Sequence, residues 1–380
     1  EKSSGGGGEE RMKPQWFRLV LTFSACILAF FKGPIVRGSQ VVEASCNDGF
    51  SIYQQRQDAV VDAFLWAWNG YKTYAWGQDE LKPISKSSQN WLGLGLTLVD
   101  SLDTMWLMGL HDEFAEAQEW VENELSFDKD VEVNFFETTI RVLGGLLSAH
   151  ALSGAPVFLA RAEDLGRRLM AAFASPSGLP WSDVHLGEAR GFAPAGVLSS
   201  LSEVSSVQLE FRYLARLTGN ATFGAAADAA MGALERARSK LEEGIDAIPP
   251  MYLDPKSGEF PAAHGGGGGN GHGVLTLGAR ADSYYEYLLK QWLASGRDPG
   301  DAGLRDQYVA AVAQVARHLV VEGRDAATGR RVAFLGELAP KSAAAQRRGG
   351  GRRGPGDRRH RAKMDHLCCF LPGTLALGHR

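Results

Sequence analysis

Apolar side chains recur at three- and four-residue spacing along most of the chain. Between Gln54 and Gly154 two runs show it clearly, Ala59-Val60-Ala63-Phe64-Ala67 and Phe114-Ala117-Trp120-Val121. This period is typical of one face of an α-helix, whereas the alternation of strands is nearly absent. We expect further helices, separated by loops rich in Gly, Pro and Ser, at Arg161–Phe173, Val204–Leu217, Phe223–Lys240, Ala281–Ala294 and Ala302–Val321.

This order of elements predicts an all-α fold made of paired helices. An α/α barrel and an α-solenoid both fit that order, but no fixed-period repeat of the ankyrin or tetratricopeptide kind occurs, which favours a closed barrel. The chain has 380 residues. Because a large helical barrel often fills such a length as one core, we expect one large domain rather than two.

The N-terminal region differs in composition. Residues 1–15 are rich in Gly, Ser and Glu and are predicted to be a disordered tail, because they cannot bury enough apolar surface. Residues 16–32 hold an apolar run that follows basic residues, which fits a signal anchor or a cleaved signal peptide better than a buried helix. Residues 33–51 read as a linker, and the catalytic barrel is expected over residues 52–380.

Two low-complexity segments interrupt this barrel. The first covers residues 264–273, with two histidines among glycines, and the second covers residues 341–363, rich in Arg and Gly. A metal site at the histidines and an anion or nucleic-acid site at the arginines are both disfavoured, because ordering such segments costs much conformational entropy. The formal net charge is only -4, so we expect no nucleic-acid partner.

The four cysteines, Cys26, Cys46, Cys368 and Cys369, lack the C-x-x-C spacing of zinc sites. No metal site is predicted from them. Adjacent cysteines rarely bridge each other, so a disulfide from Cys368 or Cys369 would need a partner elsewhere. The cysteine count leaves the redox compartment open.

The segment VNFFETTIRVLGGLLS places Glu137 and Arg141 one helical turn apart in otherwise apolar sequence. On a surface helix these charges would form an ordinary salt bridge. The apolar neighbours leave little solvent-facing surface, however, so we expect both charges to point into an enclosed space, where buried charges need partners or a ligand.

Three more segments combine acidic and apolar residues. Asp282 and Glu286 lie one turn apart in ARADSYYEYLLK, where Arg280 precedes the helix and three tyrosines offer rings and hydroxyls of the kind that sugar-binding clefts use. Asp282 could instead serve only the helix N-terminus. The spacing of Glu203 and Glu210 predicts one shared helix face, and the pair Asp100 and Asp103 lies in LVDSLDTMWLM. Together these residues predict a carboxylate-lined cavity suited to polyhydroxylated ligands and acid–base chemistry.

The motifs that hold these residues resemble a known family. In order along the chain they are RQDAVVDAFLWAWNGYKTYAWGQDEL, LVDSLDTMWLMGL, FFETTIRVLGGLLSA, SEVSSVQLEFRYLARLTGN, ADSYYEYLLKQWL and MDHLCCFLPGTLALG. They are similar to the motifs of the class I α-1,2-mannosidases, glycoside hydrolase family 47, from about Ile52 to the end. The resemblance implies an (αα)7 barrel, a bound calcium ion, and removal of α-1,2-linked mannose from N-glycans with inversion of configuration.

The resemblance also implies roles for individual residues. Glu137 matches the acid that protonates the leaving oxygen through a water, and Asp282 matches a second catalytic acidic residue. Residues expected to bind substrate are Arg141, Glu203, Glu210, Arg280, Glu286, Asp100, Asp103 and His366. High-mannose N-glycans are the expected partners, and we expect a monomer in the endoplasmic reticulum or Golgi, with a lumenal catalytic domain and possible membrane attachment through the N-terminal segment.

Some family motifs are missing. The sequence contains neither the Arg-Pro-Glu string that carries the usual base nor the Asn-Thr-Glu string whose threonine binds calcium. The family cysteine that pairs with the one matching Cys369 is also missing, so we expect Cys369 to lack its partner. We therefore expect an incomplete barrel without its C-terminal helices, and we predict that these residues alone are inactive and poorly soluble.

Two alternative functions compete with this enzyme. A glycan-binding mannosidase-like factor in the degradation of misfolded glycoproteins resembles the same family, but the segments around Glu210 and Asp282 look closer to those of trimming enzymes. A ligand-free α-solenoid would leave the clustered carboxylates unexplained.

Overall fold

The structure is a computed structural model that describes residues 46–241, 245–261, 273–340 and 358–379, with side chains from residue 52 onward. All of these residues belong to the second of two compact units, Glu43–Arg380. The predicted tail, the apolar segment at residues 16–32, Cys26, most of the linker and most of both insertions lie outside the described residues, and Cys46 lies outside the described side chains.

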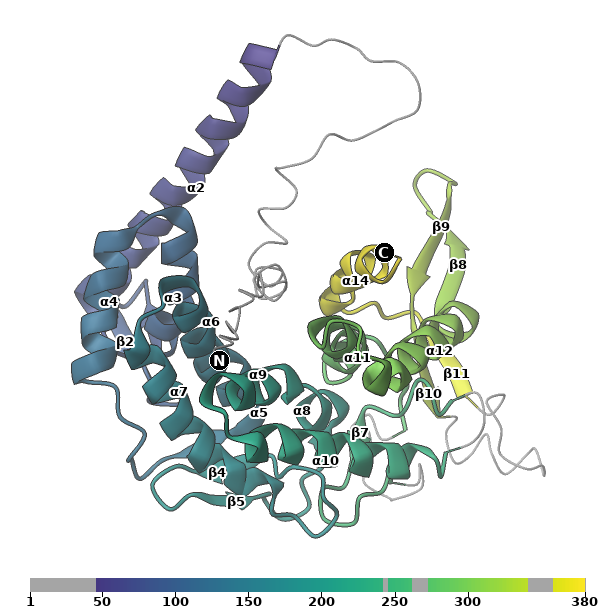
Figure 1. The fold of residues 1–380 in the computed structure, drawn as a ribbon. Helices are drawn as coiled ribbons and strands as arrows, with labels where there is room; N and C mark the ends of the chain where they lie inside the picture. Colours follow the sequence, from purple (N-terminus) through teal and green to yellow (C-terminus); the bar gives the residue numbers. More distant parts are fainter. Residues whose placement is uncertain (1–45, 242–244, 262–272, 341–357, 380) are drawn as a thin grey trace, which may run out of the picture. The chain divides into compact units, whose positions relative to one another are not determined.

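Helices make up most of the described chain, as the apolar spacing predicted (Figure 1). They are α2 (Cys46–Ala75), α3 (Leu96–Met108), α4 (His111–Asn123), α5 (Phe135–Glu137), the π-helix η2 (Thr138–Leu143), α6 (Gly144–Ser153), α7 (Pro156–Leu169), α8 (Leu201–Ser205), α9 (Gln208–Thr218), α10 (Ala221–Arg238), α11 (Asp282–Ala294), α12 (Ala302–His318) and α14 (Leu371–Gly378). Short 3₁₀ turns are η3 (Met170–Phe173), η4 (Pro299–Asp301) and η6 (His366–Phe370).

Short antiparallel strands connect these helices. The pairs are β1 (Glu80–Lys82) with β2 (Ser87–Gln89), β6 (Ser199–Ser200) with β7 (Tyr252–Leu253), β8 (Val320–Arg324) with β9 (Arg331–Leu335), and β10 (Glu337–Pro340) with β11 (Arg358–Arg361). The strands β3 (Glu132–Asn134), β4 (Asp183–His185) and β5 (Arg190–Phe192) form a three-stranded sheet. They are too short to give an apolar alternation in the sequence.

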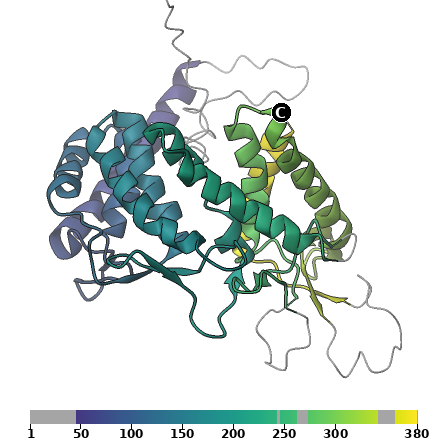
Figure 2. The same ribbon diagram turned by 60° about the horizontal axis from the view of Figure 1, so that its bottom comes forward.

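Neighbouring helices pack as hairpins, which supports the predicted pairing of helices (Figures 1 and 2). The pairs α3–α4, α6–α7, α9–α10 and α11–α12 lie against each other, and α3 also packs on α6. Their apolar faces bury two clusters of side chains, one around Leu102 and Phe211 and the other around Leu253 and Leu288. The burial of such faces is the main stabilising contribution to the fold.

The predicted helix Val204–Leu217 is two helices. α8 ends at Ser205, Ser206 has non-helical angles (φ -128, ψ 46), and α9 begins at Gln208. The Ser206 hydroxyl donates to the Ser283 hydroxyl at 2.7 Å. Serine side chains that bond away from the helix favour such breaks. Glu203 and Glu210 therefore stand on different helices, and the prediction that they share one helix face is wrong.

Several predicted boundaries also differ from the structure. Helix α2 begins at Cys46, inside the segment 33–51 expected to be a linker, and α7 begins at Pro156 rather than at Arg161. The helix expected up to Val321 ends at His318, and β8 begins at Val320. The second insertion was expected to reach Lys363, whereas folded structure resumes at Arg358 with strand β11. The two valines that begin β8 continue the apolar pattern of the helix, whereas β11 consists only of Arg and His and gives no apolar pattern from which to place a boundary.

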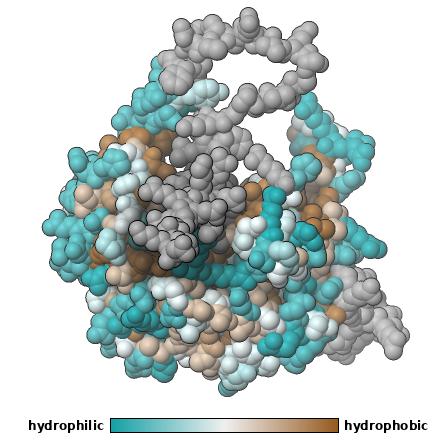
Figure 3. Space-filling view, in the orientation of Figure 1, coloured by the Kyte–Doolittle hydropathy of each residue, from teal (hydrophilic) through white to brown (hydrophobic). Residues whose placement is uncertain are grey.

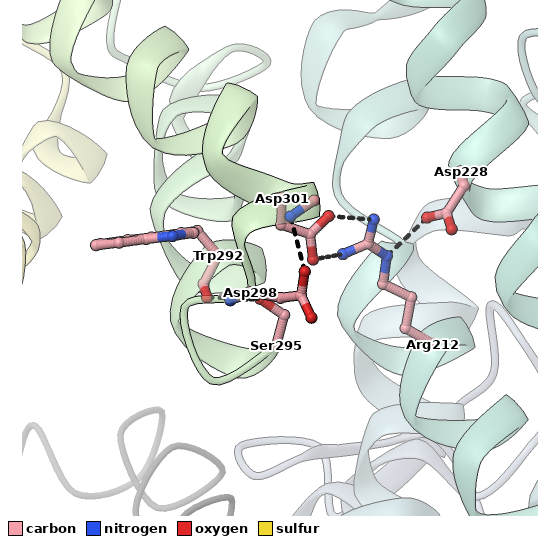
Figure 4. A network of polar contacts seen from close by, with 7 residues as sticks. Arg212, Asp228, Trp292, Ser295, Asp298 and Asp301 are labelled. Carbon is pink, nitrogen blue, oxygen red and sulfur yellow. Dashed lines mark hydrogen bonds and ion pairs between the residues drawn. The ribbon is translucent and has the colours of Figure 1, made fainter.

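Arg212, on α9, contacts two other helical elements (Figure 4). Its guanidinium donates to both carboxylate oxygens of Asp301, at 3.0 and 3.2 Å, and its Nε donates to Asp228 at 2.6 Å. Asp228 belongs to α10, and Asp301 ends η4. Because the guanidinium fork fixes both distance and direction, this network sets how α9 lies against α10 and the start of α12.

α2 exposes large apolar side chains. Trp66 is 82% exposed, and Ile52 and Val60 are about half exposed on the same helix. Apolar surface near the position of α2 is also visible in Figure 3. Exposed apolar surface of this kind favours association, in line with the predicted poor solubility, which itself stays a prediction. No helix of the described residues is long and apolar enough to cross a membrane.

Candidate active site

Glu137 and Arg141 form the ion pair that their spacing predicted. Glu137 ends α5, and the π-helix η2 carries Arg141, whose Nε donates to Glu137 Oε2 at 2.7 Å. Arg141 Nη1 also lies 3.7 Å from Asp100 Oδ2 on α3. The side chains of Glu137 and Arg141 are 30% and 42% exposed, so the pair faces a partly open space rather than the enclosed one expected.

The helix that follows Glu137 is wider than the regular α-helix expected from the sequence. Its π-helical hydrogen bonds include one from the Gly144 N–H to the Thr139 carbonyl. Such π-helical turns occur frequently at functional sites. A Cβ added to Gly144 would lie 3.7 Å from Glu210 Cγ, an ordinary contact distance. Glu210 therefore lies beside the helix that continues from the π-helical turn carrying Arg141.

Asp100 and Asp103 lie on α3, near the Glu137–Arg141 pair. Burial raises the pKa of Asp100 to about 6, although the charge of Arg141 opposes the shift. Burial also raises the pKa of Asp103, which accepts a hydrogen bond from the Ser148 hydroxyl at 2.9 Å. A carboxyl group with a raised pKa can hold a proton near neutral pH, as acid–base chemistry requires.

Asn134 connects Glu137 to a second carboxylate. Its Oδ1 accepts the Glu137 N–H at 2.9 Å, and its Nδ2 donates to Glu203 Oε1 at 3.3 Å. Glu203 is the third residue of α8, and its Oε2 accepts the Ser200 N–H in a capping box. Arg280 Nη1 lies 3.9 Å from Glu203 Oε1, and the Arg280 side chain is 55% exposed. Glu203 is therefore a structural cap as well as a candidate cleft residue.

Asp282 is the first residue of α11, with a hydrogen bond to a side chain on another helix. The Ser202 hydroxyl of α8 donates to Asp282 Oδ1 at 2.9 Å. Burial raises the pKa of Asp282, and the bond from Ser202 opposes that shift. Hydrogen bonds from the backbone N–H groups of Ser283 and Asp282 lower the same pKa, so Asp282 interacts with the N-terminus of its own helix as well as with Ser202.

Glu210 carries a carboxylate with a buried oxygen. Tyr287 donates to Glu210 Oε1 at 2.8 Å, and Oε2 is buried without a hydrogen-bond partner among the described residues. Burial raises the pKa of Glu210 to about 7. On the same side of α11, Glu286 accepts a hydrogen bond from Lys290 at 2.6 Å. This pocket holds a proton or a donor-bearing ligand better than a bare negative charge.

Two tyrosines expected near a sugar are instead part of the core. Tyr284 and Tyr285 are 1% and 2% exposed, and their rings pack against each other with centroids 5.1 Å apart. Only Tyr287 of the three reaches a predicted cleft carboxylate. The apolar residues that share the helix face of Tyr284 and Tyr285 draw both rings inward, so their proposed role in sugar binding is wrong.

The last two predicted residues lie at η6. The His366 side chain is 87% exposed, and its Nδ1 lies 3.5 Å from Asp365 Oδ1. This position does not join His366 to the carboxylates above. Cys369 is exposed and Cys368 buried, both as free thiols among the described residues. The pairing of Cys369 stays a prediction.

Comparison with known protein families identifies the family of this chain. The model of glycosyl hydrolase family 47 matches residues 63–380. The chain belongs to this family. Among similar family 47 proteins, the endoplasmic reticulum mannosyl-oligosaccharide 1,2-alpha-mannosidases of Rattus norvegicus and Homo sapiens are 47% and 48% identical, each over 85% of this chain. The chain spans 44% and 41% of their lengths, respectively.

A solved family 47 structure has the same fold. The chain matches the alpha-1,2-mannosidase from Trichoderma reesei with a TM-score of 0.71 and 26% identity, over 86% of this chain and 63% of that chain. The predicted all-α class, an (αα)7 helical barrel, is therefore confirmed. The roles that the resemblance assigned to single residues are not tested by this match.

The described residues do not fit a calcium site. Calcium is bound by about six to eight oxygen atoms. No group of three or more His, Cys, Asp or Glu among the described residues is arranged to hold a metal ion, and the family's calcium-binding threonine motif does not occur in the sequence. No chemical step is therefore assigned to calcium.

Sequence reasoning missed three residues that hold the site together. Asn134 joins Glu137 to Glu203, and Ser202 holds Asp282. Asp79, fully buried, accepts backbone N–H groups from the loop that leads into α3, among them that of Leu94 at 2.9 Å. An asparagine just before FFE is a typical helix N-cap and could have been found. The other two contacts join residues far apart in the sequence and leave no local signal.

Proposed function

We propose that the protein hydrolyses terminal α-1,2-linked mannose from Man9-type N-glycans with inversion of configuration. The observation that carries the proposal is the Glu137 carboxylate, held 2.7 Å from Arg141, which also lies 3.7 Å from Asp100. Family membership and the names of its relatives give the bond type. The charged residues around Glu137 give a partly open, polar site for a polyhydroxylated ligand.

In this proposal Glu137 is the acid that protonates the leaving oxygen through a water molecule. Arg141 orients its carboxyl group, and Asp100 adds a group whose pKa lies near neutral pH. Asp282 is the second catalytic acidic residue, and burial raises its pKa. Inversion requires acid and base to lie roughly 6.5–9.5 Å apart, with a water between the base and the sugar. The base is not assigned to any described residue.

The remaining predicted residues would bind the sugar. Glu210 and Glu286 line one side through α9 and α11, while Arg280 and Glu203 line another side at the start of α8 and α11. Carboxylates that accept sugar hydroxyls and arginines that donate to them suit a mannose residue. His366 would contribute through its exposed imidazole.

We also propose the lumen of the secretory pathway, in the endoplasmic reticulum or Golgi, as the location. Support comes from the names of the relatives and from the apolar segment at residues 16–32, interpreted as a signal anchor or signal peptide. Calcium dependence stays part of the proposal on the strength of the family alone. High-mannose N-glycans on glycoproteins are the proposed partners, bound by a monomer.

The proposal is tested by incubating the protein expressed from its transcript with a Man9 oligosaccharide, with and without a calcium chelator. Release of mannose that the chelator abolishes supports the enzyme and its calcium. Binding of the oligosaccharide without release of mannose would instead support the glycan-binding alternative, which no observation favours at present. The 380-residue chain, assayed alongside, is predicted to release none.

A further inference from the structure

Glu337, at the start of β10, is a buried carboxylate that the proposed reaction does not use. It is 3% exposed. Lys363 donates to its Oε1 at 2.9 Å, the Thr276 hydroxyl lies 3.4 Å from the same oxygen, and Arg361 lies 4.0 Å from Oε2. The contact with Glu337 raises the pKa of Lys363. Because a charge buried this deeply needs partners, Glu337 holds these segments together.

Hydrogen bonds lead from Glu337 to the start of α11. Thr276 Oγ1, in contact with Glu337, also accepts the Gly278 N–H at 2.9 Å. The Gly278 carbonyl in turn accepts the N–H groups of Ala281 and Asp282, each at 3.1 Å. The Glu337 carboxylate is therefore linked through one threonine to the turn from which Asp282 extends.

The same turn is held closely on its other side. A Cβ added to Gly278 would lie 2.6 Å from Asp365 Cβ, so the segment that follows Lys363 packs directly on the turn. Arg280 has a φ of 78, a left-handed conformation that costs energy for a residue with a side chain. The Arg280 carbonyl accepts the Ser202 N–H at 3.0 Å. Such a conformation persists only where surrounding contacts enforce it.

We propose that Glu337, through its ion pair with Lys363, is a positioning residue for Arg280 and Asp282. The pair fixes β10 and the segment after β11 around the Thr276–Asp282 turn, and the turn fixes the direction of both side chains. The kinetic part of this inference rests on the proposed function. The structural part, that the pair orders the turn, does not.

Glu337 and Lys363 differ in exposure, so their replacements are expected to have different effects on the turn. The Glu337 side chain is 4% exposed and that of Lys363 is 61% exposed. Replacing Lys363 leaves a buried carboxylate with only weak partners, whereas replacing Glu337 leaves an ammonium group that can turn to water. Lys363→Met is therefore expected to disturb the turn more than Glu337→Gln, and Lys363→Arg, which keeps the charge, is expected to disturb it least.

The test measures backbone amide exchange by NMR and mannose release, both in the protein expressed from its transcript. For Glu337→Gln we expect exchange at Gly278, Ala281 and Asp282 to quicken by about tenfold or more, with amides of α3 unchanged. We expect kcat to fall about 10- to 100-fold with KM within about twofold. Glu322→Gln, in an exposed pair with Arg331, is the matched control and should change neither.

Each outcome decides the inference. Unchanged exchange and kcat in Glu337→Gln would overturn it, and so would an equal rise in exchange over the whole chain, because Glu337 would then stabilise the fold in general. Faster exchange confined to the turn in Glu337→Gln, with exchange in Lys363→Arg close to that of the wild type, would support the inference. If the wild-type protein releases no mannose, the proposed function fails, and amide exchange alone decides whether Glu337 orders the turn.

Discussion

Asn134 caps the short helix that ends in Glu137, with Oδ1 2.9 Å from the Glu137 backbone nitrogen. Its side-chain nitrogen Nδ2 donates to Glu203 Oε1. A helix N-cap contributes typically about 1 kcal/mol. We expect Asn134→Ala to lower the free energy of unfolding by about 1–2 kcal/mol, measured by urea denaturation, because it loses both contacts.

Asn134→Ser separates these two contacts. Serine caps helices as well as asparagine does but is too short to reach Glu203. We expect it to retain most of the stability while loosening Glu203. Equal losses in the serine and alanine variants would show that the contact with Glu203, and not the cap, carries the effect.

The burial of Glu210 predicts a pH-dependent stability. Its pKa is raised from 4.5 to about 7 in the folded chain, so between these values the folded state binds more protons than the unfolded state. Stability should therefore fall as pH rises from about 4.5 to 7 and stay reduced above that range. Glu210→Gln removes the charge and keeps an acceptor for Tyr287, and we expect it to gain about 1–3 kcal/mol at pH 8 and little at pH 4.5.

The measurement for Glu210 is thermal or urea unfolding at several pH values. Glu119→Gln, on the exposed side of α4, is the control and should leave the pH dependence as in the wild type. A pH profile of Glu210→Gln that parallels the wild type would show that Glu210 is ionised in the folded state at neutral pH.

Sequence predicts most accurately those helices whose apolar spacing continues without a break over their whole length. α10 and α11 fall within two residues of the expected ranges because each buries one continuous apolar face. The break at Ser206 was missed because the contact that favours it is with Ser283, distant in the sequence. Tertiary contacts of this kind override local period.

The candidate site was predicted in part for the same reason. Glu137 and Arg141 are four residues apart, so their contact follows from helix geometry. The partners of Glu203 and Asp282 come from other elements, Asn134 on one side and Ser202 on the other. His366 was assigned from the resemblance alone, and its exposed side chain lies beside Asp365.

The hydrogen bonds of Arg212 predict that this residue stabilises the fold at a place away from the candidate site. Lysine keeps its charge but cannot donate to Asp228 and both oxygens of Asp301 at once. We expect Arg212→Lys to lower the free energy of unfolding by about 1–3 kcal/mol. Arg167→Lys, in a largely exposed pair with Glu163, should change it by less than about 0.5 kcal/mol. Similar losses in both variants would contradict a specific role for the guanidinium fork.

The ends of the second insertion are adjacent in the fold. Pro340 pairs with Arg358 across β10 and β11, so residues 341–357 can be replaced by a short turn. We expect that replacement to change the free energy of unfolding by less than about 1 kcal/mol, because loop length affects closure entropy only weakly. A deletion extended to Lys363 removes β11 and the partner of Glu337, and should be strongly destabilising. Equal effects of the two deletions would contradict this boundary.

The central claim, inverting hydrolysis with Glu137 as the acid, is tested most directly by the anomer of the first mannose released. Proton NMR can follow a Man9 oligosaccharide during the first turnovers of the protein expressed from its transcript. We predict that β-mannose appears first and that Glu137→Gln abolishes its release. Initial α-mannose, or undiminished release by Glu137→Gln, would contradict the account.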